Sequence, residues 1–266
     1  MTADDFGASM SVNQAVEVAH ASGILTTTSL MVAAPAVMDA VNRAKELPKL
    51  RVGLHLVVVR GKPSLPPEQI PDIVGPDGLL DRNLGRAGVR YFFLPNVRRQ
   101  LAREIRAQFE AFQATGLELD HANAHNHMHL HPIVLGLMIK IGREFGLRGV
   151  RLPWEPRGTV LLLPWLALMK WRLKKSKMVF NDFFFGMRDT GRMDSKTLQN
   201  FVDALPDGVS EIMLHPALDS GVWVEPEAVN FQFRDECAAL IDPSVRAKIR
   251  AVGAELISFS DLISSR

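Results

Sequence analysis

Apolar residues along the chain follow two alternating patterns, a helical spacing of three to four residues and short runs rich in β-branched residues. The clearest helix spans residues 96–115, where Leu101, Ile105 and Phe109 share one face opposite a basic and polar side. The helical spacing predicts helices at residues 11–21, 36–47, 96–115, 132–145, 195–205 and 243–252. The short apolar runs predict strands at residues 24–32, 51–59, 117–122, 149–152, 209–214 and 256–259.

This alternation of strands and helices is typical of a parallel sheet with helices packed against it. The number of repeats favours a closed or nearly closed (β/α) barrel over an open sheet. No linker, internal repeat or low-complexity tract divides the chain, so we expect residues 1–266 to form a single domain. Residues 61–88 are rich in glycine and proline, which predicts a long loop over one barrel face, a common place for functional residues.

Composition narrows the class of protein. The chain has 47% hydrophobic and 23% charged residues, as globular proteins do, and its net charge of +2 is too small to indicate a nucleic-acid partner. The single cysteine, Cys237, cannot form an intramolecular disulfide and suits a reducing compartment. The first residues lack the pattern of a secretory signal, and the longest apolar stretch, residues 160–171, is shorter than the roughly 20 residues that cross a bilayer. The sequence therefore predicts a cytoplasmic protein.

An acidic pair stands near the beginning of the chain, in Asp4-Asp5-Phe6-Gly7. Catalytic side chains of a barrel lie at the carboxyl ends of its strands, so residues 1–3 would form a truncated first strand ahead of the pair. Neighbouring strand residues point to opposite faces, and the two carboxylates can share a site only at a bend, which Gly7 permits. One carboxylate would then bind a metal and the other would accept a proton from water. The alternative is a turn residue or a helix cap.

Five of the eight histidines fall between positions 121 and 131, and those at 125, 127, 129 and 131 alternate strictly. In an extended segment alternate side chains share a face, so these four could converge on one site. Their position between a strand and a helix favours metal binding or catalysis over a row of solvated side chains. They cannot all be ligands, because a catalytic metal takes about three protein groups and keeps a position for water.

Two further histidines, His55 and His215, lie within and at the end of apolar strands. A lone histidine in such a strand is more often a core residue than a ligand. Together with the acidic pair and the histidine cluster, they form a constellation that chance explains poorly. Arg151, at the end of its predicted strand, is a candidate to orient a carboxylate or the substrate, and the alternative is a surface arginine.

Four segments resemble the YdjC-like carbohydrate deacetylases in content, order and spacing. They are TADDFG at residues 2–7, GLHL at 53–56, AHNHMH at 124–129 and EIMLHP at 211–216. Each motif alone is weak, but the set extends over nearly the whole chain and is specific. The resemblance implies an irregular, TIM-barrel-like (β/α) barrel that removes acetyl groups from N-acetylated sugars with a divalent metal. By position it implies a set of roles: metal ligands Asp5, His55 and His125, general base Asp4 and general acid His215.

Residues 120–125, DHANAH, look most like the branch of deacetylases associated with hopanoid biosynthesis (HpnK). That branch implies an N-acetylglucosaminyl hopanoid, a sugar on a polycyclic lipid, as substrate. Many relatives have Asp-Ser-His where this chain has Asn123-Ala124-His125, which keeps the ligand and removes a carboxylate beside it. The alternatives are a deacetylase of soluble chito-oligosaccharides and a non-catalytic sugar- or lipid-binding barrel. The retained acid, base and metal ligands argue against a non-catalytic barrel, because binding alone does not need them.

A His/His/Asp ligand set is compatible with Zn²⁺, and Mg²⁺, Mn²⁺ and Co²⁺ also accept mixed nitrogen and oxygen ligands. We expect a divalent cofactor, with Zn²⁺ or Mg²⁺ as the first candidates. His127 and Arg151 are predicted to contact the substrate or to support the ligands. His121, His129 and His131 are assigned no role.

Residues 154–177 combine Trp154, Trp165 and Trp171 with a run rich in leucine and methionine and with a basic end. This composition is typical of an element that lies on an anionic membrane, and a core helix with a solvated basic end is the alternative. We therefore expect an N-acetylated sugar or glycolipid as partner and no nucleic acid. Residues 154–177 would give peripheral contact with the inner membrane face.

Overall fold

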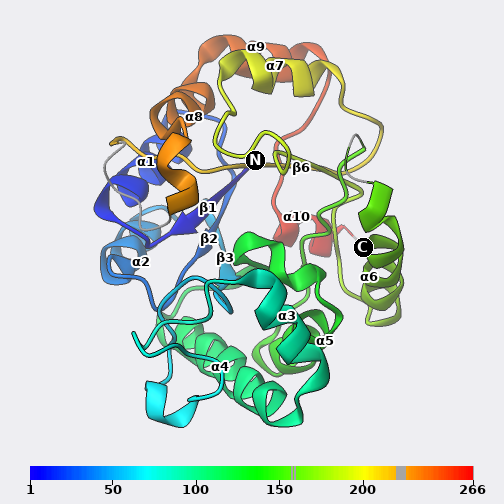
Figure 1. The fold of residues 1–266 in the computed structure, drawn as a ribbon. Coiled ribbons are helices and arrows are strands. Elements are labelled where there is room, and N and C mark those ends of the chain that lie inside the picture. Colours follow the sequence, from blue (N-terminus) through cyan, green and yellow to red (C-terminus); the bar gives the residue numbers. More distant parts are fainter. Residues whose placement is uncertain (157, 159, 220–225, 266) are drawn as a thin grey trace.

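The computed structural model describes residues 1–156, 158, 160–219 and 226–265. Six parallel strands form one sheet in the order β4-β3-β2-β1-β6-β5, so the first strand of the chain lies inside the sheet. The strands are β1 (Thr2–Phe6), β2 (Thr27–Leu30), β3 (Arg51–Leu56), β4 (Leu119–Ala124), β5 (Phe183–Phe185) and β6 (Ser210–Leu214). The sheet curls into a half-barrel with helices around it (Figure 1), which confirms the predicted TIM-barrel-like α/β fold.

Helices surround the sheet. In Figure 1, α7, α8 and α9 lie above the sheet, α1 and α2 to its left, α4 and α5 below it, and α6 to its right. The α-helices of the described residues are α1 (Met10–Ala21), α2 (Val37–Glu46), α3 (Leu84–Phe93), α4 (Pro95–Ala114), α5 (Pro132–Gly142), α6 (Leu163–Lys175), α7 (Ser195–Asp203), α8 (Phe233–Ile241), α9 (Pro243–Ala251) and α10 (Phe259–Ser264). Short 3₁₀ helices are η1 (Pro67–Gln69), η2 (His125–Leu130), η3 (Arg143–Phe145), η4 (Val160–Leu162) and η5 (Pro226–Asn230).

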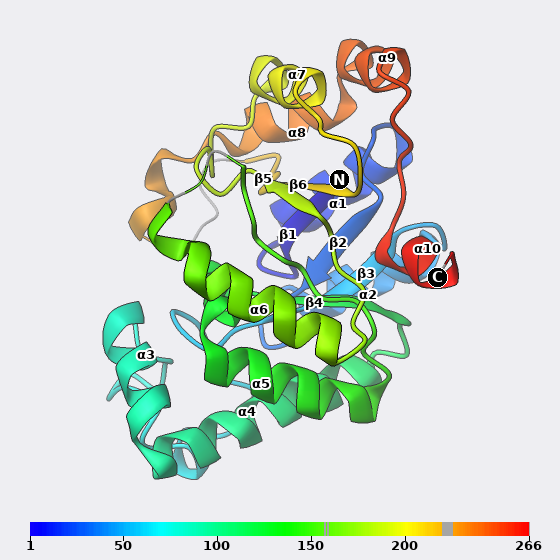
Figure 2. The ribbon, with the colours of Figure 1, turned by 90° about the vertical axis from the view of Figure 1, so that its right-hand side faces the viewer.

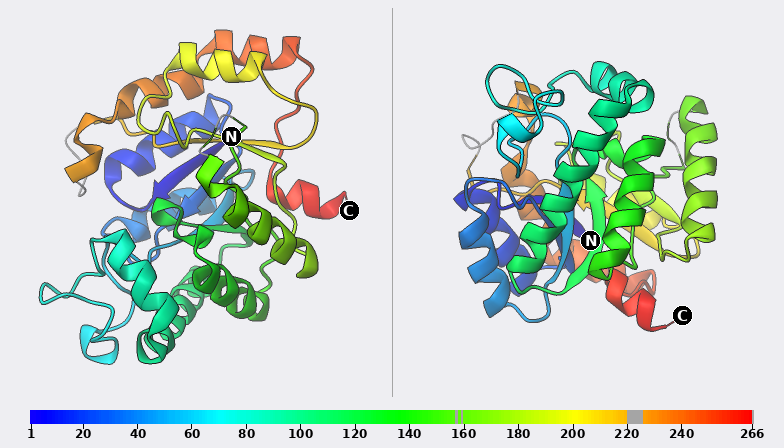
Figure 3. Two further views of the ribbon diagram at one scale, coloured as in Figure 1. Left: turned by 45° about the vertical axis from the view of Figure 1, so that its right-hand side comes forward. Right: turned by 90° about the horizontal axis from the view of Figure 1, so that it is seen from below.

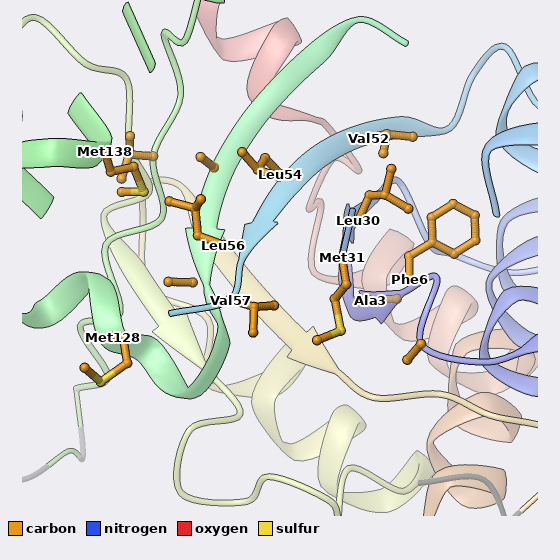
Figure 4. Close-up of a cluster of buried hydrophobic side chains, with 14 of the residues drawn as sticks. Ala3, Phe6, Leu30, Met31, Val52, Leu54, Leu56, Val57, Met128 and Met138 are labelled. Carbon is orange, nitrogen blue, oxygen red and sulfur yellow. The ribbon is translucent and has the colours of Figure 1, made fainter. Parts of the chain in front are cut away.

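Apolar side chains of the strands pack against the surrounding helices. Phe6, Leu30 and Leu54 are fully buried, and so is Met138 of α5. Figure 4 shows this cluster, which extends from Phe6 past Leu54 to Met138. Burying a side chain of this size contributes roughly 1.5–3 kcal/mol relative to leaving it exposed. The core therefore fixes the strands, and with them the residues at their carboxyl ends.

The long helix α4 carries the predicted apolar face and also anchors the loop before it. Glu104 and Gln108 are buried on this face. Glu104 accepts hydrogen bonds from the backbone N–H groups of Ser64, at 2.7 Å, and Leu65, at 3.0 Å. These bonds hold the glycine- and proline-rich loop against the helix. The loop is shorter than the predicted 61–88, because α3 begins within that range.

The predicted strand at residues 149–152 forms only isolated bridges, to Ala122 of β4 on one side and to Val179, ahead of β5, on the other. The prediction of a regular strand there is wrong, because neither neighbour supports more than a single bridge. The bridges nevertheless hold this segment beside the sheet, where the Arg151 side chain is fully buried. The alternative interpretation of Arg151 as a surface arginine is therefore wrong.

Two predicted strands at the ends of the chain also need correction. The first strand is not limited to residues 1–3, since β1 extends to Phe6, is buried throughout and contains the acidic pair. The strand predicted at residues 256–259 is wrong, because Ser258 caps α10 through a reciprocal box of hydrogen bonds with Asp261. A run of four residues is too short to distinguish a strand from the approach to a helix.

The tryptophan-containing segment forms a packed helix with an exposed outer face. Leu166, Met169 and Leu173 of α6 are buried. Trp165 and Trp171 are 45% and 57% exposed. The helix thus anchors itself in the core and leaves an apolar surface outside. Within the described residues, no helix combines the length and apolarity that spanning a bilayer would need.

Candidate active site

The acidic pair lies inside β1, at a local break in its pairing. The register between β1 and β2 shifts between Ala3 and Phe6, and Asp5 has a left-handed backbone with φ 63°. The predicted bend therefore exists, but it lies at Asp5 itself and precedes Gly7, which has φ 93°. A positive φ is unusual for a residue other than glycine and occurs where the surrounding structure enforces it. The break lets the two neighbouring carboxylates, both buried, serve different partners.

Asp5 lies among histidines from two neighbouring strand ends. Its Oδ1 atom is 3.2 Å from His55 Nε2 and 3.2 Å from His125 Nδ1. The two ring nitrogens are 3.3 Å apart. Burial opposes ionisation of Asp5, but its interactions with the nearby His125 and His55 rings outweigh burial and hold the Asp5 pKa well below its ordinary value. The parallel sheet brings these three residues together because its carboxyl ends meet at one edge.

These three side chains could hold a metal ion. Their ligand atoms all lie within 4.8 Å of one another, and all three residues are buried. Among the described residues, Asp5 Oδ1 accepts no hydrogen bond although it is buried. A buried carboxylate oxygen without a donor, facing two imidazole nitrogens, fits a divalent cation. The donor set of one oxygen and two nitrogens does not select among Zn²⁺, Mg²⁺, Mn²⁺ and Co²⁺.

Asn123 of β4 orients one of these histidines. Its Oδ1 atom is 2.7 Å from His55 Nδ1, and its Nδ2 atom donates to Asp4 Oδ1 over 3.1 Å. A carboxylate oxygen only accepts, which fixes the amide orientation and makes Asn123 Oδ1 the acceptor from His55. The proton of His55 then lies on Nδ1, and the Nε2 lone pair faces Asp5 and His125. Asn123 thus provides the acceptor that fixes the orientation of the His55 ring.

We expect Asn123→Leu to weaken metal affinity by roughly 10–100-fold, because His55 loses the acceptor that fixes its protonated nitrogen. Competition with a chromophoric chelator would measure the dissociation constant. Asn42→Leu, at an exposed position of α2, is the matched control and should bind metal as the wild type does. An unchanged affinity in Asn123→Leu would show that this hydrogen bond does not organise the ligands.

Asp4 is held by a buried arginine. Arg151 donates from both terminal nitrogens, over 2.6 Å to Asp4 Oδ2 and 2.8 Å to Asp4 Oδ1. Burial opposes ionisation of Asp4, but the Arg151 charge, with smaller help from His55, outweighs it and lowers the Asp4 pKa far below its ordinary value. Among the described residues, Oδ2 accepts only from Arg151 and so keeps a lone pair, whereas Oδ1 also accepts from Ser29 and Asn123. Asp4 is therefore ionised and rigidly placed.

Arg151 itself bridges two carboxylates. It donates to Glu211 Oε1 from Nε over 3.0 Å and from a terminal nitrogen over 2.8 Å. Its guanidinium also lies 5.1 Å from the centre of the Phe184 ring. Burial opposes its charge, but Asp4 and Glu211 outweigh this and raise the Arg151 pKa. A paired, fully buried arginine of this kind positions a carboxylate and cannot act as an acid.

His215 follows directly after β6 and completes the group. Its Nε2 atom is 3.8 Å from Asp5 Oδ2, and its ring is 5.7 Å from that of Phe231. The backbone N–H of His215 donates to buried Glu236, which fixes the chain at this strand end. His215 Nδ1 is buried and has no hydrogen-bond partner among the described residues. In the sheet, β4 and β6 lie on opposite sides of β1. The His215 imidazole therefore borders the pocket from the side opposite His125 and His127.

Comparison with family models and with known proteins shows which family the chain belongs to. Residues 1–251 match the family model described as YdjC-like protein. The chain belongs to the YdjC-like family. Among similar proteins, the carbohydrate deacetylase of Brevibacillus brevis is 32% identical over 98% of both chains. The carbohydrate deacetylase of Geobacillus stearothermophilus is 30% identical over 98% of this chain and 96% of its own.

A solved structure shares the fold of this YdjC-like chain. It is that of a proposed cellobiose-phosphate cleavage protein from Enterococcus faecalis V583. The two chains superpose with a TM-score of 0.76 over 98% of this chain and 97% of the other, at 22% sequence identity. The likeness supports the barrel-like architecture and carries no statement about the substrate.

The histidine cluster of the YdjC-like chain does not form the extended row that its alternation predicted. Residues 125–130 form η2, and Asn126 and His127 have left-handed backbones with φ 50° and 52°. Only His125 and His127 of the cluster border the pocket. The expectation that four alternating histidines share one face is therefore wrong, because the chain turns immediately after β4.

The other three histidines of the cluster lie apart from the pocket. His121 is hydrogen-bonded to Asp120 at 2.8 Å and stacks on Phe259. His131 caps α5 by accepting from the Ile133 N–H over 3.3 Å. His129 is fully buried, and neither of its ring nitrogens has a hydrogen-bond partner among the described residues.

The YdjC-like chain forms a pocket of about 180 Å³ at the carboxyl ends of β1, β3, β4 and β6. Six of the seven predicted site residues border it, and Arg151 lies behind Asp4: the six are Asp4, Asp5, His55, His125, His127 and His215. The sequence did not indicate Arg60, Thr190, Ala228 or Phe231, which also line it. Arg60 could have been suspected, since it directly follows the predicted strand at 51–59. Thr190 and Phe231 lie in irregular chain and carry no such signal.

Proposed function

We propose that this chain is a metal-dependent N-deacetylase for an N-acetylglucosamine unit, carried by a hopanoid-type glycolipid. The observation that carries the proposal is the presence in one buried pocket of the Asp5, His55 and His125 group together with Asp4 and His215. Its relatives named carbohydrate deacetylase support the enzyme class, a hydrolase of an amide bond. A barrel that only bound sugar or lipid would not need this combination of groups.

The chemistry needs a stronger electrophile and a stronger nucleophile than an amide and water provide. A divalent cation held by Asp5, His55 and His125 would polarise the amide carbonyl and make an attacking water more acidic. Asp4 would accept a proton from that water at Oδ2, the oxygen that keeps a free lone pair. Its low pKa makes Asp4 a weak base, so precise placement by Arg151 has to compensate.

Collapse of the tetrahedral intermediate requires a proton on the departing nitrogen. His215 borders the same pocket and is the proposed donor. The added water has by then formed the new C–O bond of the acetate; once the nitrogen is protonated, the C–N bond breaks and the sugar leaves with a free amine. Arg60 and His127 border the pocket as well and would contact the sugar ring. The pocket volume of about 180 Å³ suits the acetamido end of a sugar and leaves a larger aglycone outside.

The outer face of α6 supports a lipid-linked substrate. Trp165 and Trp171 are exposed, and Lys175 lies 5.1 Å from the Trp171 ring. Tryptophan and lysine together are typical of helices that lie in the interface of an anionic membrane. Such a helix would bring the enzyme to a sugar that is attached to a lipid, through peripheral contact with the membrane face.

A direct comparison of two substrates tests the proposal. We expect kcat/KM for an N-acetylglucosaminyl hopanoid in mixed micelles to exceed that for diacetylchitobiose by about tenfold or more, since remote binding energy contributes to the rate. Acetate release measures both. A preference for diacetylchitobiose would support the alternative of a soluble chito-oligosaccharide substrate. No acetate from either, with metal present, would contradict the enzyme and favour a non-catalytic binding barrel.

A further inference from the structure

The corner between α3 and α4 exposes a compact group of large apolar side chains. Phe92 is 43% exposed, Phe93 68% and Leu94 45%, and Val89 one turn earlier is 59% exposed. The rings of Phe92 and Phe93 contact each other edge to face, with centroids 4.9 Å apart. An exposed cluster of this kind indicates a surface that contacts another body. We name residues 89–94 the α3–α4 corner.

The corner is held in place by its buried side. Tyr91, which is 1% exposed, donates from its hydroxyl group to the Val58 carbonyl over 2.5 Å. Arg98 donates to the Phe92 carbonyl over 2.6 Å. These contacts fix the backbone while the neighbouring aromatic rings point outward. The apolar surface is therefore part of the fold and not a consequence of loose packing.

Basic residues accompany this corner. Residues 84–103 contain five arginines and no aspartate or glutamate; Arg86 is paired with Asp81, and the other four have no acidic partner within this segment. Residues 163–177, which include α6, likewise contain five lysines and arginines and no acidic residue. These ten charges exceed the net charge of +2, so the rest of the chain is net acidic. Both segments with exposed aromatic residues are thus suited to an anionic surface.

The α3–α4 corner and the first turns of α6, which carry Trp165, lie on the same side of the molecule as the pocket, whereas the basic residues 170–177 follow at the other end of α6. In Figure 2, α3 and the first turns of α6 both project on the side where the carboxyl ends of the strands lie. The right-hand view of Figure 3 shows the same arrangement from below. The pocket lies at those carboxyl ends. A flat body that touched the corner and the first turns of α6 would therefore face the pocket.

We propose that the α3–α4 corner is a second lipid-contacting element, which inserts Phe92, Phe93 and Leu94 into the interface of an anionic bilayer. Its arginines contact the headgroups, and the corner acts with α6 to turn the pocket toward the membrane. A second copy of this chain suits the corner poorly, because a symmetric contact would place the same arginines against each other. This orientation would give the pocket access to a lipid-linked sugar, and that purpose rests on the proposed function. Membrane binding by the corner does not depend on the proposed function.

Co-sedimentation with vesicles tests the corner. The probes are vesicles of phosphatidylcholine with and without 30% phosphatidylglycerol, together with the full chain. We expect the wild type to bind the anionic vesicles and Phe93→Ser/Leu94→Ser to bind them about tenfold more weakly or worse, since two exposed apolar side chains no longer enter the interface. Ile241→Ser/Val252→Ser is the matched control, because it removes two exposed apolar side chains near α8 and α9, away from α3 (Figure 1).

Each outcome decides the proposal. Binding that falls in Phe93→Ser/Leu94→Ser but not in the control supports it, as does loss of binding when phosphatidylglycerol is omitted. Wild-type binding by both double variants would overturn it, and so would absence of wild-type binding to anionic vesicles. A concentration-dependent dimer that only Phe93→Ser/Leu94→Ser abolishes, without vesicle binding, would assign the corner to a second copy. Acetate release from diacetylchitobiose should be the same in both variants, which separates this test from the proposed activity.

Discussion

Removal of the divalent cation is expected to reduce acetate release from an N-acetylglucosamine substrate by roughly a thousandfold or more. The magnitude follows from the several kcal/mol of transition-state stabilisation that a Lewis acid provides. Asp5, His55 and His125 are the candidate ligands, and their close approach around an unsatisfied carboxylate oxygen is the structural reason. Dialysis against a chelator followed by an acetate assay measures the loss. Addition of Zn²⁺ or Mg²⁺ should restore the rate.

A histidine variant tests whether the loss of acetate release comes from the candidate ligand group. His125→Ala should lose both metal and activity, whereas His20→Ala should keep both, because His20 lies on α1 and contacts the Leu25 carbonyl away from the pocket. Thermal unfolding of both variants checks that the fold persists. Full activity of the chelated wild type, or of His125→Ala, would be incompatible with a cation at this group.

Replacement of Asp4 by asparagine should lower kcat by about 10²–10⁴-fold while leaving metal affinity within a small factor of the wild type. Asparagine retains the shape of the side chain and an oxygen that accepts from Arg151, but it cannot take a proton from water. The measurement is acetate release at saturating substrate, with metal content determined on the same samples. Retained metal with lost rate is the signature of a base that is not a ligand.

Asp207→Asn is the matched control, since Asp207 is exposed. It should leave the rate unchanged. Asp4→Asn also removes one of the two negative partners of Arg151, so we expect some loss of thermal stability. A rate close to that of the wild type in Asp4→Asn would reject the base assignment, and loss of metal in this variant would make Asp4 a ligand instead.

Much of the fold and of the pocket could be predicted because each followed from local patterns. The strand-helix alternation predicted the parallel sheet, and a parallel sheet aligns the carboxyl ends of its strands. His55, His125 and His215 each lie at or near such an end, so their convergence in space followed from topology. Arg151 was also a candidate because of its place at the end of a predicted strand, although that segment forms only isolated bridges.

Other features depend on tertiary contacts and could not be predicted in this way. The strict alternation of histidines suggested an extended chain, but left-handed residues Asn126 and His127 turn it into η2. β5 has only three residues and α3 lies within a glycine-containing segment, so neither pattern was long enough to be distinct. The exposed corner at Phe93 requires knowledge of which side of α3 is buried, which periodicity alone did not reveal.

The most direct test of the account is a metal titration of the chelated protein, with acetate release and bound metal followed together. If Asp5, His55 and His125 form the cation site, activity should rise in proportion to bound metal and saturate at about one equivalent per chain. Asp5→Ala should neither bind the metal tightly nor recover activity. Acetate release in the metal-free wild type, or full recovery of activity in Asp5→Ala, would contradict a metal-dependent deacetylase built on this group.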